Sequence, residues 1–147
     1  ELEGSGWLNL NNQSGNLEIK YQKLGFLGFD DPHEKLDDAS TLTGQVAETK
    51  DSDYIFGVAH APYMAVIEHF TKAGAGFLFA GHTHGGQICL PGGHPIVVPC
   101  RAPRKFISGR WEHFGLQGYT SRGTGGCGIA ARWNCPPEIT LHILRAA

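Results

Sequence analysis

The stretch FLFAGHTHGGQICLPGG, residues 77–93, places two histidines one residue apart, directly after a short apolar run, and surrounds them with glycine. The apolar run at 76–80 (GFLFA) has the length of a buried strand and ends at Gly81-His82. The flanking glycines free the backbone to turn sharply and to come close to a bound group. The stretch therefore predicts a strand that delivers His82 and His84 to the edge of a sheet.

A second apolar run lies just upstream and ends in the same way. Residues 54–59 (YIFGVA) read as a buried strand that ends at His60. Pro62 is favoured in a first helical turn and opens a predicted helix over about 63–73, with a buried stripe of Met64, Ile67 and Phe70. The resulting β-α-β unit places His60 and His82 just past the carboxyl ends of its strands, where open α/β sheets bind ligands.

The rest of the chain supports an α/β fold. Residues 17–21 and 24–29 predict two strands joined by a turn at Gln22–Lys23, and the polar segment 33–50 predicts one weak helix. We expect further short strands at 95–98, 117–121 and 138–144. The runs at 54–59 and 76–80 are apolar on both sides, a pattern typical of strands that are covered on two faces.

Composition narrows the class of protein. The 147 residues suit one domain with a real core. Residues 1–70 hold 12 acids against 4 Lys and Arg, whereas 71–147 hold 2 acids against 8. The second half therefore carries a positive field that would attract an anionic ligand, although a chance imbalance on a solvated surface stays open. The chain has no sustained basic run and hence no signal for nucleic-acid binding.

Cysteine spacing and hydropathy exclude several other classes. The four cysteines form no C-x-x-C pair, so we expect free, partly buried thiols rather than a zinc knuckle or a thioredoxin-type site. No apolar run approaches the roughly 18 residues of a membrane span, and we expect no signal peptide within these residues. The chain does not begin with methionine, which we interpret as a sign of missing upstream sequence, so localisation stays unknown.

The histidines suggest a metal site. In an extended chain, His82 and His84 would project to the same side, about 6.6 Å apart at Cα. Two such imidazoles can hold one ion, or each can hold one of two ions spaced about 3.5–4 Å apart. His60 would add a third imidazole from the neighbouring strand. Histidines of a polar loop without a metal are the alternative, and imidazole alone does not choose among zinc, iron, nickel or similar ions.

The motif GHTHGGQICLP, preceded by AHAP and a helix, resembles the calcineurin-like metallophosphoesterases of the bacterial branch that carries GHTHGGQ. The resemblance continues through GFDDP, HPIVVP, YTSRGTGG and CPPEITLHIL, and so covers nearly the whole chain. It implies that His60 and His82 bind one metal ion and that His84 binds the second. It also implies a two-sheet sandwich with α-β-β-α layers.

The family's other motifs, D-x-H, G-D-x-x-D and G-N-H-[DE], do not occur in these residues. The resemblance therefore implies that residues 1–147 are the C-terminal portion of a single metallophosphoesterase domain whose N-terminal half is absent. Asp30 and Asp31 read as turn residues rather than as replacement ligands. With no bridging carboxylate, this part alone is expected to be inactive, and its catalytic and substrate-binding residues stay unknown.

For the intact protein the resemblance implies a hydrolase, a phosphatase or phosphodiesterase that cleaves phosphate mono- or diester or pyrophosphate bonds. The reaction would use a dinuclear metal-activated water, with two divalent transition metal ions such as Mn, Fe or Zn. The substrate would be a small phosphorylated molecule, including lipid-linked or sugar-nucleotide-linked phosphates, and membrane association stays unknown. Two alternatives stay open, a non-enzymatic scaffold that keeps the fold and a mononuclear zinc-binding protein that uses His60, His82 and His84. Five cations after the motif could add to the positive field, without an assigned role: Arg101, Arg104, Lys105, Arg110 and Arg122.

Overall fold

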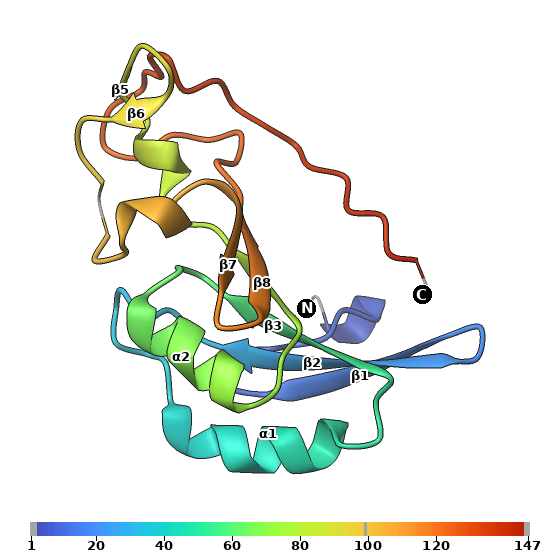
Figure 1. Cartoon of the computed structure of the whole chain (residues 1–147). Helices are drawn as coiled ribbons and strands as arrows, with labels where there is room; N and C mark the ends of the chain where they lie inside the picture. The colour runs from blue at the N-terminus through green and yellow to red at the C-terminus, as the bar shows by residue number, and fades with distance from the viewer. Residues whose placement is uncertain (1–2, 99, 146–147) are drawn as a thin grey trace.

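The chain forms one six-stranded sheet and a separate small hairpin within residues 3–98 and 100–145, the part that the computed structural model describes (Figure 1). In spatial order the strands of the sheet are β1 (Ser14–Ile19), β2 (Gln22–Phe29), β3 (Tyr54–Ala59), β4 (Phe77–Ala80), β8 (Leu116–Thr120) and β7 (Gly109–His113). The hairpin pairs β5 (Cys89–Leu90) with β6 (His94–Pro95). The helices are α1 (Leu42–Thr49) and α2 (Met64–Lys72), with 3₁₀ turns at Glu3–Ser5, Ala39–Thr41, His84–Gly86 and Arg104–Phe106.

The centre of the sheet is parallel. β2, β3, β4 and β8 run in the same direction, whereas β1 pairs antiparallel with β2, and β7 pairs antiparallel with β8. The carboxyl ends of the four parallel strands therefore meet at one edge. The predicted strand at 54–59, the predicted helix and the predicted strand at 76–80 are confirmed, the last two shorter by one residue or more.

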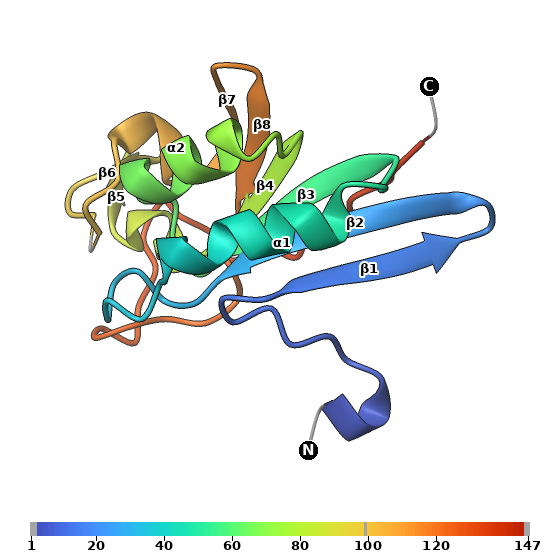
Figure 2. The same cartoon turned by 90° about the horizontal axis from the view of Figure 1, so that it is seen from below.

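Both helices cover one face of the sheet (Figure 2). The residues that fill the interface between helices and sheet are fully buried: Leu27, Val66, Ile67, Phe70 and Leu78. Burying a side chain of this size stabilises a fold by about 1.5–3 kcal/mol. The apolar stripe of α2 is as predicted at Ile67 and Phe70, and Met64 packs only partly against the core. No helix in the described part of the chain is long and apolar enough to cross a membrane.

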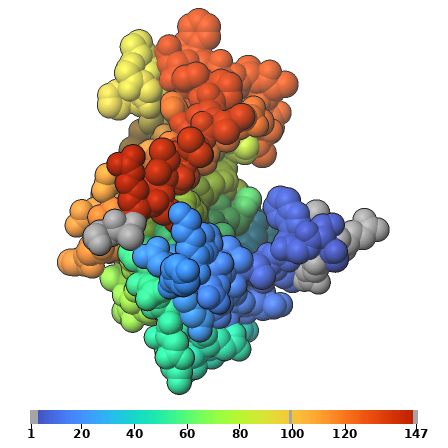
Figure 3. All heavy atoms as spheres, turned by 90° about the vertical axis from the view of Figure 1, so that its right-hand side faces the viewer, coloured from blue at the N-terminus to red at the C-terminus, as the bar shows by residue number. Residues whose placement is uncertain are grey.

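The opposite face of the sheet is aromatic. Phe26 and Phe79 stack on Phe56 with ring centroids 5.3 and 5.7 Å apart. The C-terminal segment lies against this face through His142, whose ring centroid is 4.9 Å from that of Phe79. The segment is spread on the surface (Figure 3), and its apolar side chains are exposed: Ile139, Leu141, Ile143 and Leu144. This face therefore has no second sheet within the described residues.

Four sequence expectations differ from the structure. Residues 138–144 alternate as a strand would, but they pair with no strand, because the segment lies over the face of the sheet, with His142 against Phe77 and Phe79. The predicted turn at Gln22–Lys23 lies instead at Lys20–Tyr21, where Lys20 takes a φ of 59°. The predicted helix at 33–50 begins only at Leu42, and the predicted strand at 95–98 reduces to the end of β6.

The shorter helix has a local cause. Asp38 caps the turn that leads into α1, since its carboxylate accepts hydrogen bonds from the Ser40 amide (2.9 Å) and hydroxyl (2.6 Å). These bonds hold the pKa of Asp38 below its usual value. An aspartate that satisfies the first free amides of a helix marks its start. The eight residues before Asp38 stay in a loop that leads from β2.

Candidate functional site

His60 and His82 leave neighbouring strands at the same edge of the sheet. His60 follows β3 directly, and His82 follows β4 after Gly81. The Gly81 amide donates a hydrogen bond of 3.0 Å to the carbonyl of His60, so the ladder between the two strands continues past their ends. The parallel pairing of β3 and β4 thereby brings both imidazoles to one place, as the sequence predicts.

The two rings touch. His60 Nε2 lies 2.8 Å from His82 Nδ1, and the ring centroids are 4.7 Å apart. At this distance one nitrogen donates a proton and the other accepts it. Two nitrogens that hold one tetrahedral ion at about 2.0–2.1 Å would lie about 3.3 Å apart. The nitrogen donors suit a divalent transition metal, which would need the pair to open by about half an ångström and both rings to turn toward the ion.

Two further polar side chains reach the same edge from β2. Asp31 Oδ2 lies 3.6 Å from His60 Nε2, and the ring of His33 lies 4.7 Å from that of His82, centroid to centroid. β2 runs parallel to β3, with Phe29 opposite Ala59, so the residues after both strands share one edge. As they stand, no three His, Cys, Asp or Glu side chains of the described residues surround a point where a metal ion could sit.

Sequence reasoning missed this contribution of β2. It interpreted Asp31 as a turn residue, and Asp31 does shape the turn, because its Oδ1 accepts from the His33 amide (2.7 Å) and its carbonyl accepts from the Leu36 amide (2.9 Å). Its second oxygen, however, faces His60. The available signal was the polar run DDPH after an apolar strand, which becomes informative once β2 and β3 are known to be parallel.

The GHTH loop is tightly wound rather than extended. His82, His84 and Gln87 have φ values of 66°, 49° and 55°. The prediction that His82 and His84 project to the same side of an extended chain is therefore wrong. Non-glycine residues in this region cost about 1–3 kcal/mol each, and they cluster at functional sites. The buried Thr83 secures the loop, since its hydroxyl donates to the carbonyl of Ile107 (2.6 Å) and accepts from the Gly85 amide (3.2 Å).

Gly85 is required by its surroundings. Its φ is 63°, and an added Cβ would lie 2.6 Å from the Cγ of Arg122 and 2.9 Å from the Sγ of Cys135. The Gly85 carbonyl accepts weak hydrogen bonds from the thiols of Cys89 (3.4 Å) and Cys135 (3.6 Å). Burial raises the pKa of the Cys89 thiol, which therefore stays protonated near neutral pH. The four cysteines are free as expected, and these two are buried under the loop.

His84 faces the C-terminal loop. Its Nδ1 lies 3.5 Å from Arg132 Nη2, and its carbonyl accepts from Arg132 Nη1 (3.2 Å). The same guanidinium donates to the carbonyls of Arg122 (2.7 Å) and Gly125 (2.6 Å). Arg132 therefore ties the GHTH loop to residues 122–135. Arg132 is not among the cations that the sequence pointed to.

Gln87 makes a second tie between the same two segments. Its amide nitrogen donates to the carbonyls of Cys127 (3.1 Å) and Ile129 (3.0 Å), and its oxygen accepts from the Cys127 amide. The side chain is buried. Gln87 of the GGQ stretch therefore stabilises the loop, and its side-chain nitrogen and oxygen are both engaged in hydrogen bonds.

Four of the five cations named from the sequence are engaged elsewhere. Arg122 forms a mostly buried ion pair with Glu138, Nη2 to Oε2 2.6 Å, and this hydrogen-bonded partner raises its pKa. Arg104 donates to the Pro95 carbonyl (2.8 Å). Lys105 lies 4.5 Å from the centroid of the Phe106 ring, and Arg110 donates to Gln117 (2.9 Å).

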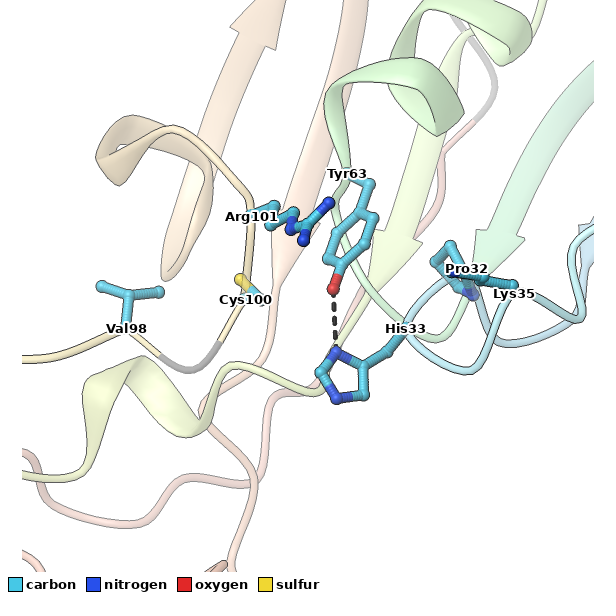
Figure 4. Close-up of a pocket in the computed structure, with 7 residues that line it drawn as sticks. All are labelled: Pro32, His33, Lys35, Tyr63, Val98, Cys100 and Arg101. Carbon is cyan, nitrogen blue, oxygen red and sulfur yellow. Dashed lines mark hydrogen bonds between the residues drawn. The ribbon is translucent and has the colours of Figure 1, made fainter.

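Arg101, the fifth cation, lines a cavity of about 570 Å³ beside the histidines (Figure 4). The wall also includes Pro32, His33, Lys35, Tyr63 and Val98. Figure 4 shows the Tyr63 hydroxyl pointing at His33, whose Nδ1 lies 2.9 Å away. His33 therefore stands between this cavity and His82.

Comparison with known proteins gives relatives of one kind. No protein-family model matches the chain. It is 28% identical, over 96% of its length, to the uncharacterized metallophosphoesterase YkoQ of Bacillus subtilis, and 32% identical, over 65%, to the uncharacterized metallophosphoesterase YkuE of the same organism. The matched regions span 50% of YkoQ and 33% of YkuE.

One solved structure is also similar, a chain proposed to be a 5′-nucleotidase from Staphylococcus aureus in complex with α-ketoglutarate. It has a TM-score of 0.46 and 12% identity, with 76% of this chain and 24% of that chain covered. Both sequence relatives are named metallophosphoesterases, the family that the GHTH motif resembles.

Proposed function

We propose that this chain forms part of a metal-dependent phosphoesterase that hydrolyses phosphate mono- or diester or pyrophosphate bonds. The observation that carries the proposal is the contact between His60 and His82, 2.8 Å apart, at the carboxyl edge of the parallel strands. A sheet edge with two imidazoles in contact and a carboxylate 3.6 Å from one of them offers the nitrogen and oxygen ligands that transition metals bind.

His60 and His82 would hold one divalent ion, and His84 would hold the second. Mn, Fe and Zn all fit such ligands. Bound there, the two ions would supply hydroxide near neutral pH and positive charge for the phosphoryl oxygens. The chain's own part is to place His60 and His82 at the ends of adjacent strands, to hold His82 and His84 in a strained loop, and to keep cations such as Arg101 near the phosphate.

The rest of the site would come from residues outside these 147. The family's D-x-H, G-D-x-x-D and G-N-H-[DE] motifs would provide the bridging carboxylate and the remaining ligands. In this proposal the chain is the C-terminal part of one domain, and a second sheet covers the aromatic face around Phe56 and Phe79. The exposed apolar side chains of residues 139–144 support that arrangement, because a covering layer would bury them.

A mononuclear site is the second candidate, favoured by the position of Asp31. His60, His82 and the Asp31 carboxylate would give two nitrogen ligands and one oxygen ligand, with the fourth position open, a set found in catalytic zinc sites. The mononuclear candidate predicts one metal ion per full-length protein, and the dinuclear candidate predicts two.

The test of the proposed function is hydrolysis of bis(p-nitrophenyl) phosphate and p-nitrophenyl phosphate by the full-length protein. We expect turnover with Mn²⁺, loss after EDTA treatment, and recovery when the metal is returned. Absence of turnover of both esters with Mn²⁺, Fe²⁺ and Zn²⁺, in a folded protein that binds no metal, would show that the scaffold alternative is right.

A further inference from the structure

The cavity beside the histidines is not used by the metal site proposed above, which lies at the sheet edge with His60 and His82 (the metal edge). We propose that it receives a second anionic group of the substrate, a phosphate adjacent to the one that is hydrolysed. The substrate class would then be a phosphoanhydride, a pyrophosphate linkage with an organic group attached, rather than an isolated monoester. This inference rests on the proposed function and narrows its substrate.

The cavity lies next to the metal edge and is of a suitable size. His33 belongs to its wall, and the same ring lies 4.7 Å from the ring of His82. The volume of about 570 Å³ falls within the roughly 300–1,000 Å³ of small-molecule sites. A phosphate held at His60 and His82 would therefore have its neighbouring group at or beyond His33.

The charges of the wall favour an anion. Lys35 and Arg101 both line the cavity, and no acidic residue is among its lining residues. Within the described residues the ion pairs are His60 with Asp31 and Arg122 with Glu138, so neither lining cation is neutralised by a carboxylate. The guanidinium of an arginine binds phosphate through paired hydrogen bonds, which are stronger than neutral ones.

The wall is also held in shape by Tyr63. Its hydroxyl forms a hydrogen bond with His33 Nδ1 (2.9 Å), so it links the start of α2 to the loop after β2. Burial raises the pKa of Tyr63, so the phenol stays neutral and keeps this bond near neutral pH.

The remaining lining residues suit the organic part of such a substrate. Pro32, Val98 and the ring of Tyr63 give an apolar wall beside the cations. Cys100 also lines the cavity, and burial raises the pKa of its thiol, so it adds no negative charge near neutral pH.

Hydrolysis would join a water oxygen to the phosphorus at His60 and His82 and break the bond between that phosphorus and the bridging oxygen. Of the two protons of water, one would go to the departing phosphate and the other to solvent.

The test compares two substrates of the full-length protein with Mn²⁺. UDP-glucose has two phosphates joined by a bridging oxygen, whereas bis(p-nitrophenyl) phosphate has a single phosphate. In Arg101→Ala and in Lys35→Ala, we expect kcat/KM for UDP-glucose to fall at least about tenfold further than that for the diester, mainly through KM. Arg101→Lys should recover part of the loss. Lys72→Ala, an exposed cation of α2, is the control and should leave both values near the parent's.

Three outcomes would overturn the inference. The first is an equal change for both substrates in Arg101→Ala. The second is a parent protein that hydrolyses the diester but not UDP-glucose. If the parent hydrolyses neither substrate, the proposed function fails. The proposed anion site in the cavity is then tested by ligand binding alone. Calorimetry with methylenediphosphonate should show at least about tenfold weaker binding to Arg101→Ala than to the parent, and equal affinities would be the third contrary outcome.

Discussion

His84 and Arg132 show how single residues hold the GHTH loop. Three non-glycine residues of the loop have positive φ, a conformation that persists only where surrounding contacts enforce it. Arg132 supplies one of these contacts, because its guanidinium donates to the carbonyl of His84 while it also holds the carbonyls of Arg122 and Gly125. This residue therefore helps to position the GHTH loop.

Replacing Arg132 should loosen the loop. In Arg132→Ala the partly buried carbonyls lose their donor, so we expect the free energy of unfolding to fall by about 2 kcal/mol. If the residue positions His84, metal affinity should fall as well. Arg132→Lys should restore the free energy of unfolding better than the metal affinity, since lysine lacks the planar guanidinium group. The measurements are urea unfolding and metal titration of the full-length protein. Parent-like metal affinity in Arg132→Ala would show that its role is structural only.

At the same scale, the sequence predicted the site in part. The contact of His60 with His82 follows from two apolar runs and one helix, because neighbouring parallel strands end at the same edge. Asp31 and His33 could not be placed in the same way. Their approach depends on the parallel pairing of β2 with β3, a long-range contact that no local pattern encodes.

Among the elements, the C-terminal segment is fixed by one polar cluster. Glu138 accepts from the Arg122 amide (3.1 Å), the Arg122 guanidinium (2.7 Å) and the Tyr119 hydroxyl (2.9 Å). Burial alone would raise the pKa of Glu138, but these hydrogen bonds outweigh it and hold the pKa below its usual value. The cluster attaches the segment to the end of β8.

The lowered pKa of Glu138 makes this attachment sensitive to acid. A carboxylate whose pKa is lower in the folded state adds stability above its unfolded pKa of about 4.3, and that stability is lost as the pH falls through the folded pKa. Glu138→Gln should therefore be about 2 kcal/mol less stable than the parent at pH 7, and the difference should shrink below about pH 4. Chemical unfolding between pH 3 and 7 measures it. The exposed Glu112→Gln is the control, and a difference independent of pH would contradict the assignment.

The elements that the sequence predicted well are those with a strong local pattern. β3, β4 and α2 follow from unbroken apolar runs and a proline-started helix. β7 was missed because Trp111, packed over Gly118 of β8, is its single buried side chain. Residues 138–144 have the alternation of a strand but lie over the face of the sheet rather than beside an edge strand, and a periodic pattern does not reveal whether a partner exists.

At the scale of the whole molecule, the sheet carries a helical layer on one face and aromatic side chains on the other. Phe26, Phe77 and Phe79 remain partly exposed there, although Phe56 is buried among them. At the proposed metal edge, His60, His82 and Asp31 are neighbours, whereas His84 is turned to Arg132. Both features fit a domain whose other part would complete the core and the metal site together.

The 147-residue chain by itself should accordingly bind metal poorly. Without a bridging carboxylate we expect at most one transition metal ion per chain, held weakly, because two imidazoles and one carboxylate leave a second ion with His84 alone. Calorimetric titration with Zn²⁺ and Mn²⁺ measures the stoichiometry. Tight binding of two ions per chain would contradict the division of ligands proposed here.

The central claim is that His60 and His82 hold a metal ion that a phosphoesterase uses, and it is tested most directly in the full-length protein. The measurement is metal content by mass spectrometry together with kcat for Mn²⁺-dependent hydrolysis of bis(p-nitrophenyl) phosphate, for the parent, His60→Ala, His82→Ala, His84→Ala and the control Lys72→Ala. Each histidine variant should lose about one ion per chain and about a hundredfold or more in kcat, with a smaller change in KM, because a metal ion stabilises charge that develops in the transition state. Lys72→Ala should keep the metal content and kcat of the parent. If His60→Ala and His82→Ala also keep them, the pair is not a metal site and the proposed function fails with it.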